Sequence, residues 1–205
     1  MKRTWIKNAN IVNEGKSFVG SVVICGEVID EIIEGNGEPS APCEEIIDAQ
    51  GYYLLPGIID DHVHFRDPGL THKADMHSES KAAAAGGVTS YMDMPNTVPQ
   101  TTTIEALNDK FADAATKSIV NYSFYFGATN DNVSLLPHLD KQRICGIKLF
   151  MGSSTGNMLV DQLDTLKYIF THAHMLIAAH CEDQEIIQAN IDVYKNPYED
   201  DLPIH

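Results

Sequence analysis

Two histidines, His62 and His64, lie two residues apart in the segment GIIDDHVHFRDPG. In an extended strand, residues at positions i and i+2 point to the same face of the sheet, so both imidazole rings can bind one metal ion. Considered alone, the pair is as readily interpreted as two surface histidines with no ligand. Two acidic residues, Asp60 and Asp61, directly precede the pair, and this context favours a metal site.

Lys148 lies in the apolar segment ICGIKLFMG, on the same predicted strand face as Gly146 and Phe150. An ammonium group buried without a partner is costly and tends to lose its charge. A neutral amine can react with carbon dioxide to give a carbamate, an anion whose two oxygens can bridge two cations. The commoner alternative is a lysine whose stem is buried while its amine reaches solvent or an acid.

His180 ends the apolar run HMLIAAH, and a third imidazole at a strand end is consistent with a metal site. A hydrogen-bonded structural histidine is the commoner outcome for one such residue. Arg66 and Asn96 follow two of the predicted strands, in HFRDPG and DMPNTVP. Guanidinium and amide donors can hold a carboxylate, so the two form a candidate anion receptor. The alternatives are an ion pair between Arg66 and Asp67, and a turn-forming role for Asn96 before Thr97.

The elements that must position these side chains change in character near residue 56. Residues 1–55 contain short β-like runs broken by glycines, which predicts a small antiparallel β domain. In residues 56–205 apolar strands alternate with helical stretches, the pattern of βα units on a parallel sheet. The predicted strands cover residues 57–64, 87–94, 119–126, 144–150 and 175–180. The predicted helices cover about 72–85, 103–117, 160–173 and 182–194, with Asp161 or Asp183 suited to capping a helix start.

Each candidate residue falls at or near the end of a predicted strand. In a (β/α)8 barrel the active site lies at the C-terminal ends of the strands, so these residues would converge at one mouth. Five strands cannot close such a barrel, which typically takes about 250 residues. The predicted fold is therefore α/β, with about five βα units of a TIM-type barrel.

Composition excludes several classes of function. The formal charge of −15 would repel nucleic-acid phosphates over most of the surface. No apolar run approaches the roughly 18 residues of a membrane span, and no signal-peptide core follows the first basic residues, so we expect a cytoplasmic protein. The four cysteines are scattered without a CxxC pair, which argues against a zinc knuckle and predicts reduced thiols.

Four stretches together resemble the amidohydrolase superfamily and, within it, the long-chain dihydroorotases: PGIIDDHVHFRDPG, AGGVTSYMDMPNTVP, GIKLFMG and AAHCED. The resemblance implies a metal-dependent-hydrolase barrel with a small N-terminal β-sandwich domain. It implies two Zn²⁺ ions per intact subunit, with His62 and His64 on the more buried ion and His180 on the other. A carbamate on Lys148 would bridge the ions.

The resemblance also implies an activity and a substrate site. Arg66 and Asn96 would bind the substrate carboxylate during the reversible cyclisation of N-carbamoyl-L-aspartate to L-dihydroorotate in pyrimidine synthesis. In the hydrolytic direction, a metal-bridging hydroxide attacks the cyclic amide. The family also uses a histidine from the sixth barrel strand and an aspartate from the eighth, and neither position exists in the 205 residues. We therefore assign no general acid or base, and expect the N-terminal, inactive portion of a longer polypeptide.

Allantoinase and hydantoinase are alternatives within the same enzyme class. Their ring substrates lack the carboxylate that Arg66 and Asn96 would bind, which favours dihydroorotase. A catalytically inactive scaffold subunit is the alternative of another class, and the presence of every ligand that the chain could hold disfavours it. A homo-oligomer and association with a carbamoyltransferase both remain open.

Overall fold

The structure, a computed structural model, describes residues 1–152, 154 and 156–194. The chain divides into two compact units, Met1–Gly57 and Ile58–His205. No helix in the described part of the chain is long and apolar enough to span a membrane. The four cysteines are free.

The first unit is a five-stranded sheet. Its strands are β1 (Arg3–Asn13), β2 (Lys16–Cys25), β3 (Val28–Glu34), β4 (Glu45–Asp48) and β5 (Tyr53–Leu54). The order is β3-β2-β1-β4, with β5 also pairing with β1. A small core of Ala9, Ile11 and Val22 packs against Phe18, Ile24, Ala49 and Leu54.

The prediction of an antiparallel layer is wrong for two of these pairings. β1, β2 and β3 form an antiparallel meander, but β4 and β5 both run parallel to β1. The reason is the connection after β3, which carries the chain from one edge of the sheet past β1, so that β4 enters in the direction of β1. The described residues of this unit form a single sheet, so they supply one layer of the expected sandwich.

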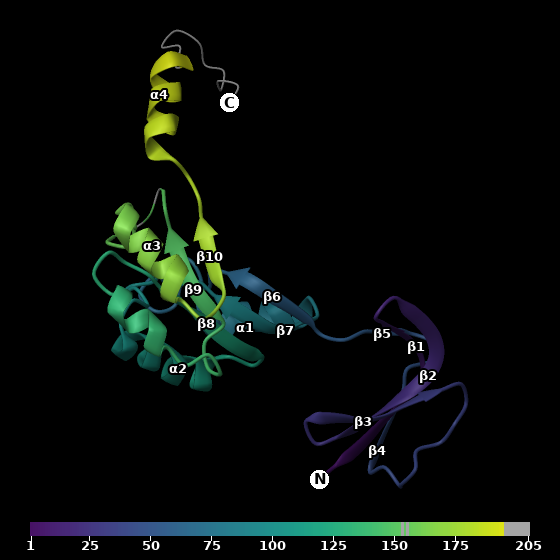
Figure 1. Cartoon of the computed structure of the whole chain (residues 1–205). Helices are drawn as coiled ribbons and strands as arrows, with labels where there is room; N and C mark the ends of the chain where they lie inside the picture. The colour runs from purple at the N-terminus through teal and green to yellow at the C-terminus, as the bar shows by residue number, and fades with distance from the viewer. Residues whose placement is uncertain (153, 155, 195–205) are drawn as a thin grey trace. The chain divides into compact units, whose positions relative to one another are not determined.

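The second unit contains five parallel strands and the helices of the chain (Figure 1). The strands are β6 (Ile58–Val63), β7 (Val88–Asp93), β8 (Asn121–Gly127), β9 (Gly146–Phe150) and β10 (Ile177–His180). Strands that are consecutive in the chain are neighbours in the sheet, in the order β10-β9-β8-β7-β6. This is the strand order of a (β/α)8 barrel wall, and it confirms the predicted partial barrel.

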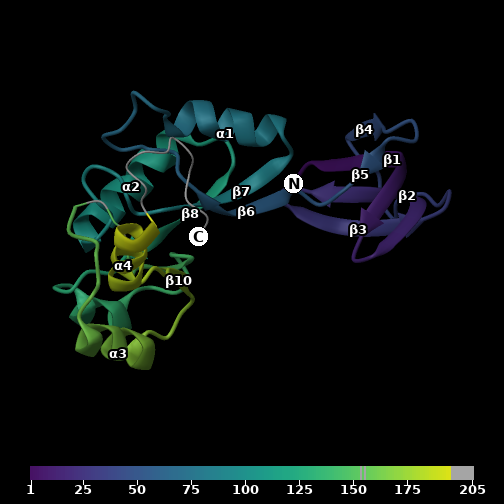
Figure 2. The same ribbon diagram turned by 90° about the horizontal axis from the view of Figure 1, so that it is seen from above.

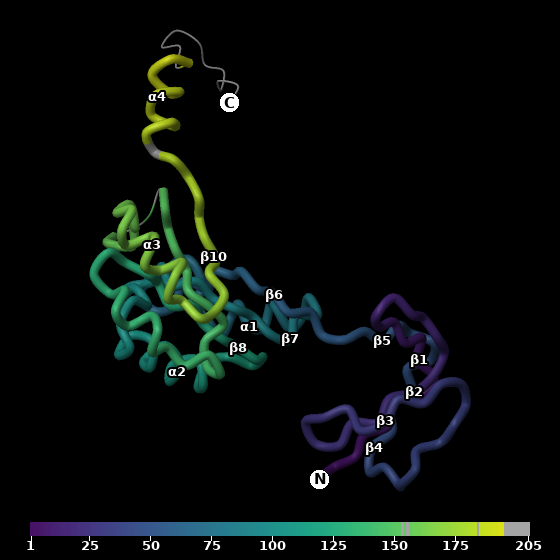
Figure 3. The backbone as a smooth tube through the Cα atoms, viewed as in Figure 1, coloured from purple at the N-terminus to yellow at the C-terminus, as the bar shows by residue number. Residues whose placement is uncertain are grey.

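The helices are α1 (Met76–Ala85), α2 (Ile104–Lys117), α3 (Leu163–His172) and α4 (Gln184–Tyr194), with a 3-10 helix η1 at Val133–His138. The four predicted helices are confirmed, and η1 was not predicted. α1 contacts β7 and α2 contacts β8. Figure 2 shows α1 lying alongside β7. The trace in Figure 3 runs from β9 through α3 to β10. The apolar core lies between the sheet and these helices and includes Phe65, Met76, Tyr91, Leu107 and Phe124.

Helix starts follow the capping chemistry of the local sequence. α1 begins later than predicted because Asp75 is its N-cap, accepting the amides of His77 and Ser78 at 2.9 Å each. Asp183 accepts the amides of residues 185 and 186 at 3.1 Å, which confirms it as a cap. Asp161 is not a cap, because its carboxylate accepts a hydrogen bond from Asn130 instead. The N-cap position of α3 is taken by the next residue, Gln162.

Candidate functional site

The two spaced histidines lie at the C-terminal end of β6. Their ring centroids are 5.3 Å apart, and both side chains are exposed. His64 Nδ1 lies 2.9 Å from the amide oxygen of Asn96, which follows β7. Because that oxygen can only accept, Nδ1 donates and Nε2 remains available as a metal ligand. Desolvation and the positive charge of Arg66 lower the pKa of His64, which favours the neutral ring that metals bind.

The segment that follows β6 is held against the segment that follows β7. Met94 N donates to Val63 O at 3.0 Å, and Phe65 N donates to the carboxylate of Asp93 at 2.9 Å. Asp93 in turn pairs with Lys110 of α2, with 2.6 Å between Nζ and Oδ2. The two side chains are 1% and 0% exposed, so a buried ion pair supports the backbone next to His64.

A second contact between these segments depends on a glycine. Val98 N donates to Pro68 O at 3.1 Å, and Gly69 lies against the same turn with φ +82°. A Cβ on Gly69 would collide with the carbonyl oxygen of Val98. The motifs HFRDPG and DMPNTVP are therefore two halves of one packed structure that carries Arg66 and Asn96.

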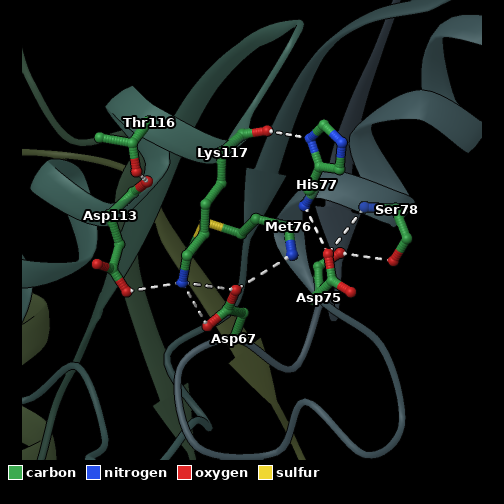
Figure 4. A network of polar contacts seen from close by, with 8 residues as sticks. All are labelled: Asp67, Asp75, Met76, His77, Ser78, Asp113, Thr116 and Lys117. Atoms are coloured by element: carbon green, nitrogen blue, oxygen red, sulfur yellow. Dashed lines mark hydrogen bonds and ion pairs between the residues drawn. The ribbon is translucent and has the colours of Figure 1, made fainter.

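Arg66 has a left-handed backbone, with φ +64°, and its side chain forms no hydrogen bond or ion pair with any described residue. The alternative in which Arg66 pairs with Asp67 is wrong for this structure. The carboxylate of Asp67 binds Lys117 Nζ at 3.0 and 3.2 Å and accepts Met76 N at 3.3 Å (Figure 4). The Asp67 side chain is 3% exposed.

Lys148 lies on β9, where every residue is buried, and is itself 4% exposed. Its amine lies 4.9 Å from the centroid of the Phe150 ring and has no hydrogen bond or ion pair with the described residues. Burial lowers the pKa of Lys148. Among the described residues, the Lys148 amine therefore does not reach an acid, and its burial shifts the equilibrium toward the uncharged form.

His180 ends β10, next to β9. Its ring centroid lies 5.9 Å from that of Phe150, and its Nε2 lies 3.3 Å from a carboxylate oxygen of Glu182. Gly152, which ends the GIKLFMG motif, approaches Glu182 so closely that a Cβ there would collide with it. The ends of β9 and β10 therefore pack together as the ends of β6 and β7 do.

The structure thus divides the six candidates into two groups. His62, His64, Arg66 and Asn96 lie at or after the ends of β6 and β7, on one side of the sheet, whereas Lys148 and His180 lie on β9 and β10, around Phe150, on the other. Among the described residues, no three His, Cys, Asp or Glu side chains lie close enough to share a metal ion. The open five-stranded sheet keeps β6 and β10 at its two edges, whereas a closed barrel makes them parts of one rim.

Sequence reasoning missed the residues that support this site, namely Asp93, Lys110 and Lys117. The available signal was the acidic residue at the end of an apolar strand in SYMDMPN, because a carboxylate buried there requires a cation or several donors. The position of that cation on α2 was not available from the sequence.

Comparison with known proteins decides the family. The family model described as dihydro-orotase-like matches residues 51–192. The chain belongs to this family. It is 36% identical over 155 residues to a dihydroorotase of Methanothermobacter thermautotrophicus, covering 74% of this chain and 34% of that protein. It is 31% identical over 192 residues to a dihydroorotase of Lactobacillus johnsonii, covering 92% of this chain and 43% of that protein.

Other proteins similar to this chain carry different names. An allantoinase of Deinococcus radiodurans is 36% identical over 165 residues, covering 78% of this chain and 37% of that protein. The solved L-hydantoinase of Arthrobacter aurescens superposes with a TM-score of 0.85 at 27% identity, covering 95% of this chain and 44% of that chain. This family member therefore spans less than half the length of these relatives. The comparisons confirm the resemblance to dihydroorotases and the barrel fold.

Proposed function

We propose that this chain contributes the first strands and part of the active site of a zinc-dependent dihydroorotase. The observation that carries the proposal is Lys148, a buried lysine with no hydrogen bond or ion pair to a described residue, in a family whose named members include dihydroorotases. A buried lysine without an ion pair is more stable as a neutral amine, or as a carbamate, than as an ammonium ion. The substrate would be a small molecule, N-carbamoyl-L-aspartate or L-dihydroorotate.

The donor set fits two zinc ions. Neutral imidazoles from His62, His64 and His180 are suitable Zn²⁺ ligands, and a carbamate formed on Lys148 would add the anionic oxygens that a bridged pair requires. When bound, the ions would lower the pKa of a shared water and polarise a substrate carbonyl. The bond from His64 to Asn96 orients that ring, and Glu182 is placed to orient His180.

Arg66 and Asn96 would supply substrate recognition. The Arg66 guanidinium is unpaired among the described residues, and the Asn96 oxygen is occupied by His64, which leaves the Asn96 amide group as a donor. A guanidinium and an amide together can hold a carboxylate. L-dihydroorotate carries a carboxylate and a hydantoin or allantoin ring does not, so this pair supports dihydroorotase above allantoinase and hydantoinase.

The scaffold alternative predicts eroded ligand positions, whereas His62, His64, Lys148 and His180 are all present. The proposal includes a cytoplasmic location. Self-association and binding of a carbamoyltransferase are tested by the native mass of the purified protein, alone and mixed with that enzyme.

The test is metal content together with turnover of the intact protein. Wild type is expected to bind about two zinc ions per subunit and to turn over L-dihydroorotate in preference to allantoin and hydantoin. Lys148→Ala and His62→Ala should each lose metal and activity, while His72→Ala, which alters an exposed histidine outside the site, should not. Two zinc ions retained by Lys148→Ala would refute the bridging role. No zinc in wild type would favour the scaffold.

A further inference from the structure

Lys117, the last residue of α2, connects three parts of the second unit (Figure 4). Its amine donates to both carboxylate oxygens of Asp67, at 3.0 and 3.2 Å, and to Asp113 at 3.0 Å. Its backbone oxygen lies 3.1 Å from Nδ1 of His77 on α1. The lysine therefore ties the segment after β6 to both neighbouring helices.

The position of Asp67 in the sequence makes this contact important for the site. Asp67 directly follows Arg66, so its carboxylate is the nearest anion along the chain to the guanidinium proposed to bind substrate. An arginine paired with an internal carboxylate would have to exchange that partner before binding another. In the structure Asp67 is bound by Lys117 and by the Met76 amide, and Arg66 has no partner among the described residues.

We propose that Lys117 is a positioning residue that keeps Arg66 available for the substrate carboxylate by holding Asp67. The inference deepens the proposed function and rests on it. Lys117 itself does not contact the substrate. It acts by neutralising a carboxylate that is 3% exposed and would otherwise compete for the guanidinium.

Removal of the amine should redirect Asp67. Lys117→Met would leave the carboxylates of Asp67 and Asp113, which now share one ammonium, facing each other without a cation. The two carboxylates each lie 3.0 Å from the Lys117 amine, so they are close enough to repel each other once that amine is removed. The repulsion is stronger where water is excluded. Asp67 would lower its energy by turning to Arg66, the adjacent cation.

The first readout is the kinetics of the intact protein with L-dihydroorotate. In Lys117→Met, KM should rise about tenfold or more, since one charge-assisted interaction with the substrate is lost, while kcat changes little. The control Asp113→Asn removes the negative charge of one Lys117 partner but leaves Asp67 bound, and its KM should equal that of wild type. The double variant Lys117→Met, Asp67→Asn removes the competing charge and should restore KM. A purely structural lysine would not be rescued in this way.

The second readout needs no turnover and separates this inference from the proposed function. Nitrogen-15 NMR of the arginine side chains, without substrate, should show the Arg66 guanidinium signal shifted and protected from exchange in Lys117→Met only. The signal should revert in the double variant with Asp67→Asn. An Arg66 signal identical in wild type and Lys117→Met would overturn the inference, whatever the enzyme turns over. If the NMR changes occur as expected but the intact protein has no dihydroorotase activity, the proposed function alone is refuted.

Discussion

Replacing Lys110 by methionine should destabilise the second unit strongly, because it breaks the buried ion pair with Asp93. Methionine has nearly the volume of the lysine stem, so the change removes the charge and leaves the packing in place. The Lys110 amine also donates to the backbone oxygen of Met94 at 3.0 Å and lies 4.8 Å from the centroid of the Phe124 ring. Both contacts are lost with the amine.

The magnitude follows from the burial of both partners. At the 2.6 Å separation of Lys110 Nζ and Asp93 Oδ2, the attraction is about 6 kcal/mol with an effective dielectric constant of about 20. Desolvation of the two ions offsets most of that attraction, so the pair contributes little net stability. Removal of the lysine alone leaves the desolvated carboxylate without its cation. We therefore expect Lys110→Met to lower the free energy of unfolding by about 3–5 kcal/mol.

Urea unfolding measured by the helical circular-dichroism signal is the appropriate assay, because α1 to α4 all lie in the second unit. The double variant Lys110→Met, Asp93→Asn should recover most of the loss, since asparagine is neutral and can still accept the Phe65 amide. The exposed Lys141 is the matched control, and Lys141→Met should change stability by no more than about 0.5 kcal/mol. A loss below about 1 kcal/mol in Lys110→Met, or no recovery in the double variant, would refute the reasoning.

Two further predictions test local features. Gly69 and Gly87 both have positive φ, +82° and +85°, but a Cβ meets the Val98 carbonyl at the first and nothing within 4 Å at the second. Gly87→Ala should lower the free energy of unfolding by about 1 kcal/mol, and Gly69→Ala should lower it by about 1–3 kcal/mol more. Equal losses in the two variants would contradict the packing of HFRDPG against DMPNTVP. Burial raises the pKa of Cys145 to about 11, so its thiol stays protonated near neutral pH. Iodoacetamide at about pH 8 should therefore alkylate the exposed Cys181 first, as peptide mass mapping would show, and equal rates would contradict the shift.

Local pattern was sufficient for much of this protein. The apolar runs and capping residues predicted the five strands and four helices of the second unit in order, because strand and helix periodicity is written in neighbouring residues. Motifs within the same stretches indicated the family, and the HxH spacing identified His62 and His64 as candidate metal ligands. Asp161 shows the limit of such reasoning, since a side chain of the right type took a partner from another loop.

Contacts between distant residues were decided only by the tertiary structure. Lys110 and Lys117 lie seven residues apart on a charged helix, where a sequence predicts solvent, yet each binds an aspartate from the sheet side of the fold. The parallel entry of β4 beside β1 depended in the same way on the path of a connection. Burial and pairing are properties of which segments meet, and a sequence orders segments along the chain without stating which of them will be neighbours. Residue types and periodicity therefore determined the candidates, and only the packing of α2 against the sheet brought Lys110 to Asp93 and Lys117 to Asp67.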